Sequence, residues 1–534
     1  MDAAKDDAAK QSAKAWVDDH LPEVSTWHRT IWELAEPAWR EYESARWYVD
    51  TLRRYGFTVE EGSGGMPTAF HATWTNGQPG AGPTVLTYAE YDAVPGNCQA
   101  AATERRPRDG LSIHAPGHTD PHSALGISTL AGVLATQAAM RRHGIPGRLV
   151  YTGEPAEKVQ GSKVVHGLRG YYDDVDAILS FHPFYMLPLC NTVRWDTHCG
   201  AYYSRIYTFT CPEPETWGYA DPDSPIPASH SAARAPGANA ALFTMYSLTK
   251  TTQDSMLPAT GGWSLSEAIL TAGQATADNL PASIAQIQYS WRVPDVAAAE
   301  AVLAVLDANA EAAARTAHCT VEKRWVARNR PGLANHTLAE VTWANLAQVG
   351  APRFGPEAVA VAQRLQQALG LTPDERPFLP ETERTIAPWD AEKLLRRHLP
   401  PEQRNWTSDD YVEMTWYAPT ARFYIARPTL AVQPGRPGYP AWVMNALGGI
   451  PETIDPMIEV AAKVVAGTML DLLRSPETLA RAAEEHRRRR AEAGDIPPLL
   501  PKDFQAPIDY RWPEYVTTPR GREWWIPTTA EESR

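Results

Sequence analysis

The 534-residue chain has few cysteines and fewer basic than acidic residues, and each shortage narrows the class of protein. Its five cysteines are an odd number without a C-x-x-C pair, which fits a reducing compartment. A net charge of -13 argues against a nucleic-acid partner. The first residues, MDAAKDDAAKQSAK, lack the apolar core of a signal peptide, and no uncharged apolar run of about 18 residues is apparent. We therefore expect a cytoplasmic protein with no membrane partner.

Two histidines and an aspartate lie in the short stretch Pro116–Ser123, which reads PGHTDPHS. The prolines and the glycine indicate a loop. Asp120 and His122 are two residues apart, so in an extended chain their side chains would lie on one side and could share a cation. The small, apolar run 124–140 predicts a buried helix with Ser123 as its N-cap. A polar loop that merely caps a core helix is the alternative.

Three predicted strands end at chemically capable side chains. They are 83–89, followed by Glu90 and Asp92; 147–152, followed by Glu157 and Lys158; and 175–179, followed by His182. One such strand end could be a solvated turn, but three beside the Asp120–His122 loop indicate a site at the carboxyl edge of a sheet. The alternation of strands with helices predicts a mostly parallel sheet covered on both faces.

The pattern changes after residue 197. Alternating strands and an alanine-rich helix predict a separate α+β domain inserted into the first. The expected boundaries are 1–197 and 329–500 for the two parts of the α/β domain, 198–328 for the insert, and 501–534 for a tryptophan-rich tail.

Five short motifs carry a resemblance that extends from about Trp27 to about Pro501. They are EYDAVPG at Glu90–Gly96, GHTDPHS at Gly117–Ser123, PAEK with GSK at Pro155–Lys163, DDVDAILSFHP at Asp173–Pro183, and SHSAARAP at Ser229–Pro236. In this order and spacing they resemble the M20 metallo-aminoacylases and peptidases, specifically the subfamily D amidohydrolases. The resemblance implies an M20-like α/β catalytic domain whose inserted α+β domain serves as a lid and forms a homodimer.

The resemblance also implies a set of metal ligands and catalytic groups. Asp120 takes the bridging position, where the subfamily usually has cysteine, and His122 and His182 match two ligand histidines. Glu157 matches the general base. His230 matches the lid histidine that stabilises the oxyanion in a neighbouring active site.

Three further positions are implied around the substrate and the ligands. Asn279 and Arg292 fall where lid residues would hold a substrate carboxylate, although a strand-surface ion pair explains Arg292 equally well. Asp92 would orient a ligand histidine, or else cap the turn after its strand.

Two residues depart from the family pattern. Lys158 replaces a metal-ligating glutamate, and an ammonium has no lone pair for a metal. Asp455 stands about where the last ligand histidine belongs. We expect Lys158 to fill the vacated metal position, paired with Asp120 and Asp455, or else to polarise the substrate carbonyl. This leaves about one divalent metal per subunit, zinc or manganese.

The expected function is metal-dependent hydrolysis of a linear amide, such as an N-acyl or aroyl amino acid. Water activated by the metal would attack, with Glu157 as the base. Two alternatives remain open. The fold could serve other C–N chemistry, such as aromatic amine deamination, or the chain could be a metal-free, non-catalytic subunit.

Overall fold

The computed structural model describes residues 7–184, 186–212, 236–257, 262–273 and 281–509, and the backbone of 514–518 and 521–525. The chain forms two compact units. The first comprises 1–198, 333–398 and 410–534, and the second comprises 199–332 and 399–409. The second unit thus contains the predicted insert and, in addition, a short segment from much later in the sequence.

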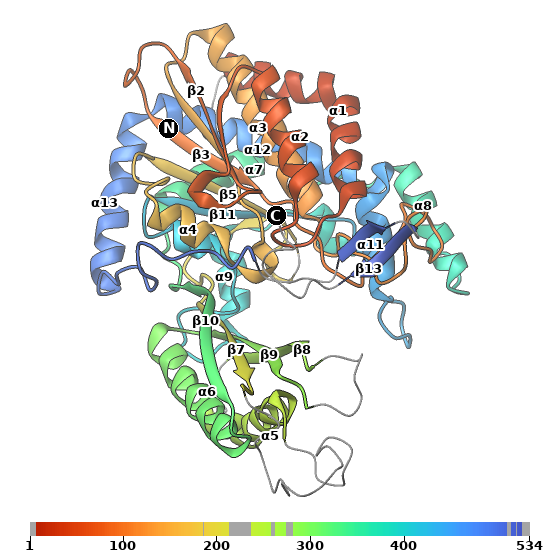
Figure 1. Ribbon diagram of the computed structural model, residues 1–534. Helices are drawn as coiled ribbons and strands as arrows, with labels where there is room; N and C mark the ends of the chain where they lie inside the picture. Colours follow the sequence, from red (N-terminus) through yellow and green to blue (C-terminus); the bar gives the residue numbers. More distant parts are fainter. Residues whose placement is uncertain are drawn as a thin grey trace, which may run out of the picture. The chain divides into compact units, whose positions relative to one another are not determined.

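A seven-stranded sheet forms the centre of the first unit (Figure 1). Its strands, in spatial order, are β1 (Thr58–Glu61), β2 (Phe70–Asn76), β4 (Gly147–Gly153), β3 (Thr84–Ala89), β5 (Ala177–Pro183), β11 (Thr420–Ile425) and β6 (Thr192–Val193). The four strands β4, β3, β5 and β11 are parallel, whereas β2, β1 and β6 join at the edges in antiparallel orientation. The predicted α/β fold is confirmed.

Helices surround this sheet. They are α1 (Ala8–Leu34), α2 (Tyr42–Arg54), α3 (His122–His143), α4 (Ser162–Leu168), α7 (His336–Val349), α8 (Pro356–Ala368), α9 (Pro388–Arg396), α10 (Tyr411–Met414), α11 (Ala441–Gly449), α12 (Pro451–Arg474) and α13 (Pro476–Glu492). Helices α3 and α12 pack against the parallel strands and against each other, and α1 packs against both.

Helix α3 is the core helix of the first unit. Nearly all of its side chains are buried, and it ends at Gly144, whose positive φ closes the helix. At Gly132 an added Cβ would lie 2.5 Å from Val465 of α12, so the glycine permits the two helices to approach closely. The helix begins at His122, two residues earlier than predicted, and Ser123 is not its cap: the Ser123 hydroxyl contacts His28 of α1 instead.

Helix α3 contradicts the expectation that the chain has no uncharged apolar run of about 18 residues. By length and composition α3 is able to cross a membrane, because its small residues are uncharged from His122 to Met140. However, 94% of its most apolar window is buried inside the fold, as is typical of a core helix.

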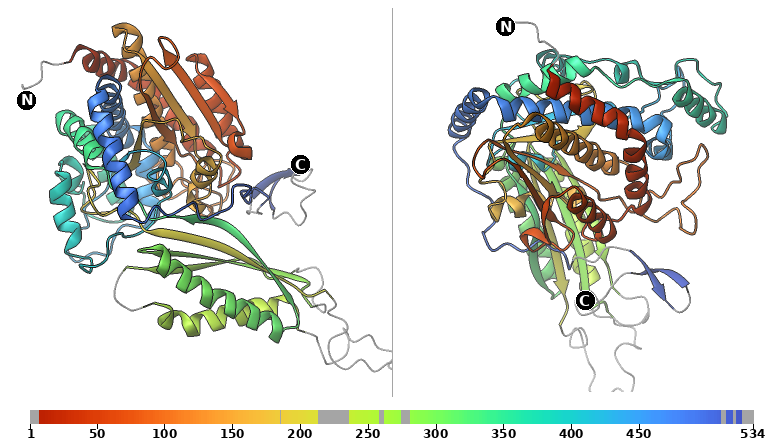
Figure 2. Two further views of the ribbon diagram at one scale, coloured as in Figure 1. Left: turned by 90° about the vertical axis from the view of Figure 1, so that its left-hand side faces the viewer. Right: turned by 90° about the horizontal axis from the view of Figure 1, so that it is seen from above.

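The second unit has its own four-stranded antiparallel sheet, in the order β10 (Thr320–Asn329), β7 (Ala201–Thr210), β9 (Ile284–Val293) and β8 (Ser264–Thr271). Helices α5 (Ala238–Met256) and α6 (Val296–Thr316) lie side by side along one face of it (Figure 2). Strand β8 was not predicted. In the tail, β12 (Glu514–Thr518) and β13 (Gly521–Trp525) form an antiparallel pair.

Candidate metal and catalytic site

Six of the predicted site residues, and with them Glu90, come together at the carboxyl edge of the parallel strands. Glu90 and Asp92 follow β3, Glu157 and Lys158 follow β4, His182 lies at the end of β5, and Asp120 and His122 lie at the start of α3. Parallel strands bring their carboxyl ends to one edge, and the buried helix α3 points its first residue at that edge. This explains why segments almost a hundred residues apart meet there.

Asp92 holds His122 in place. The His122 Nδ1–H donates to Asp92 Oδ1 over 2.6 Å, and the backbone N–H of Lys158 donates to Asp92 Oδ2 over 2.8 Å. Burial would raise the pKa of Asp92, but His122 and Lys158 outweigh it and lower the pKa. Because Nδ1 is engaged, the other ring nitrogen, Nε2, faces the centre of the cluster.

Lys158 places its ammonium among three acceptors. Its Nζ lies 3.0 Å from Asp120 Oδ2, 3.1 Å from His122 Nε2 and 3.4 Å from Glu157 Oε2. Burial would lower the pKa of Lys158, but Asp120 and Glu157 outweigh it and raise the pKa above its usual range. The side chain is therefore a fixed positive charge.

Asp120 joins the two histidines. Its Oδ2 lies 3.4 Å from His182 Nε2 and 3.9 Å from His122 Nε2. His182 donates from Nδ1 to the carbonyl of Pro183 over 2.6 Å, which leaves Nε2 directed at Asp120. The predicted ligands Asp120, His122 and His182 thus lie within reach of one another, as a shared ion requires.

Arg427 is a cation that the sequence analysis missed. It follows β11, and its Nη1 lies 3.8 Å from Asp120 Oδ1 while donating to the carbonyl of Thr119 over 2.9 Å. No motif marked it, although its place after a central parallel strand was a usable signal.

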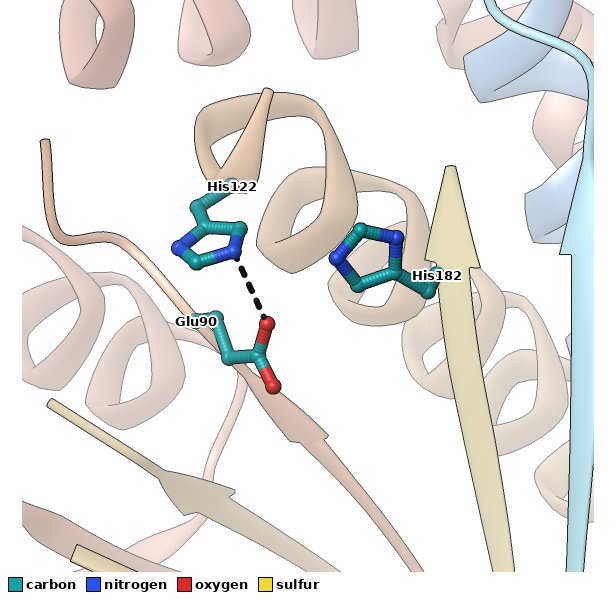
Figure 3. Close-up of side chains that lie close together, drawn as sticks. All are labelled: Glu90, His122 and His182. Carbon is teal, nitrogen blue, oxygen red and sulfur yellow. Dashed lines mark ion pairs between the residues drawn. The ribbon is translucent and has the colours of Figure 1, made fainter. Parts of the chain in front are cut away.

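Glu90 is the second omission. Figure 3 shows its carboxylate pointing toward His122 and near His182, and the ligand atoms of these three buried residues lie within 4.8 Å of one another. The Oε1 atom accepts from Lys163 over 2.7 Å, and Lys163 also donates to Asp410 over 2.6 Å. The EYD motif held the signal, because Glu90 and Asp92 are two residues apart after one strand.

The charges of the cluster test whether a metal fits. Its carboxylates are Glu90, Asp92, Asp120 and Glu157, and its cations are Lys158 and Arg427; Lys163 and Asp410 balance each other. With neutral histidines the cluster carries two excess negative charges, the complement of one divalent ion. The Glu90 and Asp92 carboxylates outweigh burial and Lys158 and raise the pKa of His122 to about 9, which reflects the same excess. Imidazole and carboxylate donors suit zinc or manganese.

Asp455 does not occupy the position predicted for it as a metal ligand paired with Lys158. It lies in α12 beside Ser25, which hydrogen-bonds its carboxylate, and burial raises its pKa to about 6. The pair predicted between Lys158 and Asp455 does not form among the described side chains, and Arg427 is the further cation at Asp120 instead.

The three predicted lid residues belong to the sequence of the second unit. His230 and Asn279 lie outside the described residues. Arg292 lies in β9, where its guanidinium stacks over the Tyr202 ring at 5.3 Å. This cation–π contact lies within the second unit.

Known proteins are similar to this chain in sequence and in fold. No family model matches the chain. A p-aminobenzoyl-glutamate hydrolase component of Escherichia coli K12 is 25% identical over 476 residues, which are 85% of this chain and 90% of that protein. The aminobenzoyl-glutamate utilization protein of Klebsiella pneumoniae shares the fold, with a TM-score of 0.50 and 16% identity over 85% of this chain and 98% of its own.

The resemblance to the M20 hydrolases is confirmed. A Xaa-Arg dipeptidase of Mus musculus is also similar, with 26% identity over 190 residues, or 34% of this chain and 39% of that protein. Both of these relatives are hydrolases, so the expected class of enzyme, an M20-like hydrolase, is confirmed with the resemblance.

Proposed function

We propose that this chain is a metal-dependent amidohydrolase that cleaves the linear amide of an N-acyl or aroyl amino acid and uses one divalent ion, zinc or manganese, per subunit. The observation that carries the proposal is the cluster of buried imidazole and carboxylate donors with two excess negative charges. The relatives named for aminobenzoyl-glutamate and for Xaa-Arg dipeptides support the substrate class.

Asp120, His122 and His182 would hold the ion. When bound, such an ion lowers the pKa of a coordinated water towards about 7 and polarises a carbonyl. Asp92 serves it indirectly, because its bond to Nδ1 fixes the His122 tautomer with Nε2 toward the centre.

Glu157 would act as the general base and later return the proton to the leaving amine. Its side chain is 10% exposed, and its Oε2 lies 3.3 Å from His122 Nε2, so it borders the place where water would be activated. Lys158 lies beside it and supplies a fixed charge where the family has a ligand of the second metal. The ammonium and the ion would compete for the single lone pair of His122 Nε2, so Lys158 would keep only Asp120 and Glu157 as partners in the loaded enzyme.

We further propose that His230 stabilises the oxyanion, that Asn279 and Arg292 hold the substrate carboxylate, and that the second unit forms a homodimer. These roles come from the resemblance and complete the site of an M20 enzyme.

A substrate panel tests the proposal. N-acetyl and N-(4-aminobenzoyl) amino acids, including p-aminobenzoyl-glutamate, are incubated with the metal-loaded and the chelated protein, and the free amino acid is measured by mass spectrometry. We expect release that depends on the metal and falls about 10²–10⁴-fold in Glu157→Gln.

Each other result overturns part of the proposal. Ammonia as the product would indicate other C–N chemistry. Activity that survives complete removal of the metal would refute the role of the ion. A protein without activity in any metal form would be a non-catalytic binding subunit.

A further inference from the structure

We infer that Glu90 is a further ligand of the metal ion and that Lys163 and Asp410 are positioning residues that aim its carboxylate into the site. The inference rests on the proposed function, because it requires that an ion binds there. Glu90 opens the EYDAVPG motif, but the ligand set that the resemblance implies does not include it.

The first observation is an unsatisfied oxygen. Glu90 is fully buried, and no described group hydrogen-bonds its Oε2 atom. A bound ion is one explanation for such an oxygen, and Glu90 differs from Glu154, whose Oε2 also has no partner among the described groups, in that its free oxygen faces candidate metal ligands. Oε2 points at His122 rather than at an apolar wall (Figure 3).

The second observation is a distance. Glu90 Oε2 lies 3.2 Å from His122 Nε2. Because Asp92 accepts the Nδ1 proton, Nε2 is the ring nitrogen that would face an ion bound at Glu90, and a bound ion would take the place of the Nε2 proton. Ligands about 2.0–2.2 Å from a tetrahedral ion lie roughly 3.3–3.6 Å apart, close to the observed separation.

The third observation is the clamp behind Glu90. Lys163 Nζ donates to Glu90 Oε1 over 2.7 Å and to Asp410 Oδ1 over 2.6 Å, and all three side chains are fully buried. The ammonium also lies 4.8 Å from the centre of the Tyr88 ring. Because Lys163 binds one carboxylate oxygen, it fixes the other one toward the histidines. Lys163 belongs to the GSK motif, and Asp410 lies 247 residues further along the chain. Both residues therefore help to orient the Glu90 carboxylate.

The charges of Lys163 and Asp410 compensate each other. Burial would lower the pKa of Lys163, but Asp410 and Glu90 outweigh it and raise the pKa, so the lysine stays charged. Asp410 compensates the charge that Lys163 brings, which leaves the charge of Glu90 available to the ion.

The test is metal binding, measured without turnover. Apoprotein is titrated calorimetrically with Zn²⁺, and the visible absorption of the Co²⁺-loaded protein reports the coordination. Glu90→Gln should weaken Zn²⁺ binding at least tenfold and change the Co²⁺ spectrum. The matched control is Glu154→Gln, since Glu154 is an equally buried carboxylate after β4 that hydrogen-bonds His166 and Tyr172. It should leave both readouts unchanged.

The positioning role has its own variant. Lys163→Met combined with Asp410→Asn removes both charges of the clamp and leaves Glu90 in place. Loss of an outer partner of a ligand typically costs 10–100-fold in metal affinity, and we expect a loss in that range. Unchanged affinity in this double variant would refute the clamp.

The outcomes separate the two proposals. If the wild type binds no ion, the proposed function falls together with this inference. If the wild type binds Zn²⁺ and Glu90→Gln binds it equally well, with the same Co²⁺ spectrum, only the inference is overturned. Should Glu90→Gln not fold, Glu90→Asp replaces it: it keeps the charge but draws the carboxylate back, so the spectrum should still change.

Discussion

Reversing the charge of Lys158 tests the electrostatic design of the site most directly. Lys158→Glu restores the ligand type that the M20 pattern has at this position. The substitution turns two excess negative charges into four, since one positive charge is lost and one negative charge is gained. Four negative charges balance two divalent ions, so we expect the metal content to rise from one to two per subunit.

The energetic consequence for the metal-free variant follows from the geometry. Lys158 Nζ lies 3.0 Å from Asp120, and at an effective dielectric constant near 20 a unit charge pair at this distance interacts by roughly 5 kcal/mol. The attraction becomes a repulsion of similar size, so the apoprotein should lose several kcal/mol of unfolding free energy and regain most of it on loading with metal. Urea unfolding with and without Zn²⁺ measures this change.

Metal analysis by mass spectrometry is the deciding assay. Lys158→Met is the control, because it removes the charge without supplying a ligand, and it should still bind one ion. A wild type with two tightly bound ions, or a Lys158→Glu variant that binds one ion as before, would refute the reasoning.

Three further predictions follow from the described contacts. Asp92→Asn should weaken Zn²⁺ binding about 10–100-fold in calorimetry, since it no longer fixes the His122 tautomer; equal affinity would contradict the orienting role. The stability of the apoprotein should depend on His122: its pKa of about 9 in the fold, against 6.5, contributes about 3 kcal/mol that is fully present below pH 6.5 and lost as pH rises through 9. Urea unfolding at pH 6 and pH 9.5 measures this loss, which His122→Gln should abolish. Gly132→Ala should destabilise the protein by about 1–3 kcal/mol, because its Cβ would meet Val465 at 2.5 Å; a melting temperature equal to that of the wild type would contradict the close packing of α3 and α12.

The convergence of the site could be predicted from the sequence because it follows from topology. Once β3, β4 and β5 are parallel, their carboxyl ends meet, and Asp92, Glu157 and His182 must lie near one another. The orientation of each side chain could not be predicted in this way. Glu90 is aimed by Lys163, which is held by Asp410, 247 residues further along the chain, and no local pattern encodes such a contact.

The misses have equally specific causes. Asp455 was assigned only by its approximate match to the last ligand histidine of the family, but it lies inside α12 next to Ser25. Strand β8 was missed because half of its residues are exposed and its sequence, SLSEAILT, shows no clear apolar alternation. Arg427 belongs to no motif, and only the position of its strand in the sheet brings it to Asp120.

The unusual residues of the centre form one consistent set. An oxygen ligand at position 120 can face two partners at once, and it does: Oδ2 of Asp120 accepts from Lys158, while Oδ1 lies toward Arg427. Lys158 and Arg427 together carry two positive charges, as many as one divalent ion. Unlike an ion, these side chains hold fixed positions and cannot dissociate into solvent. A carboxylate at position 120, a lysine at a ligand position and an arginine after β11 therefore explain one another, because any one of them alone would leave a buried charge without its counterpart.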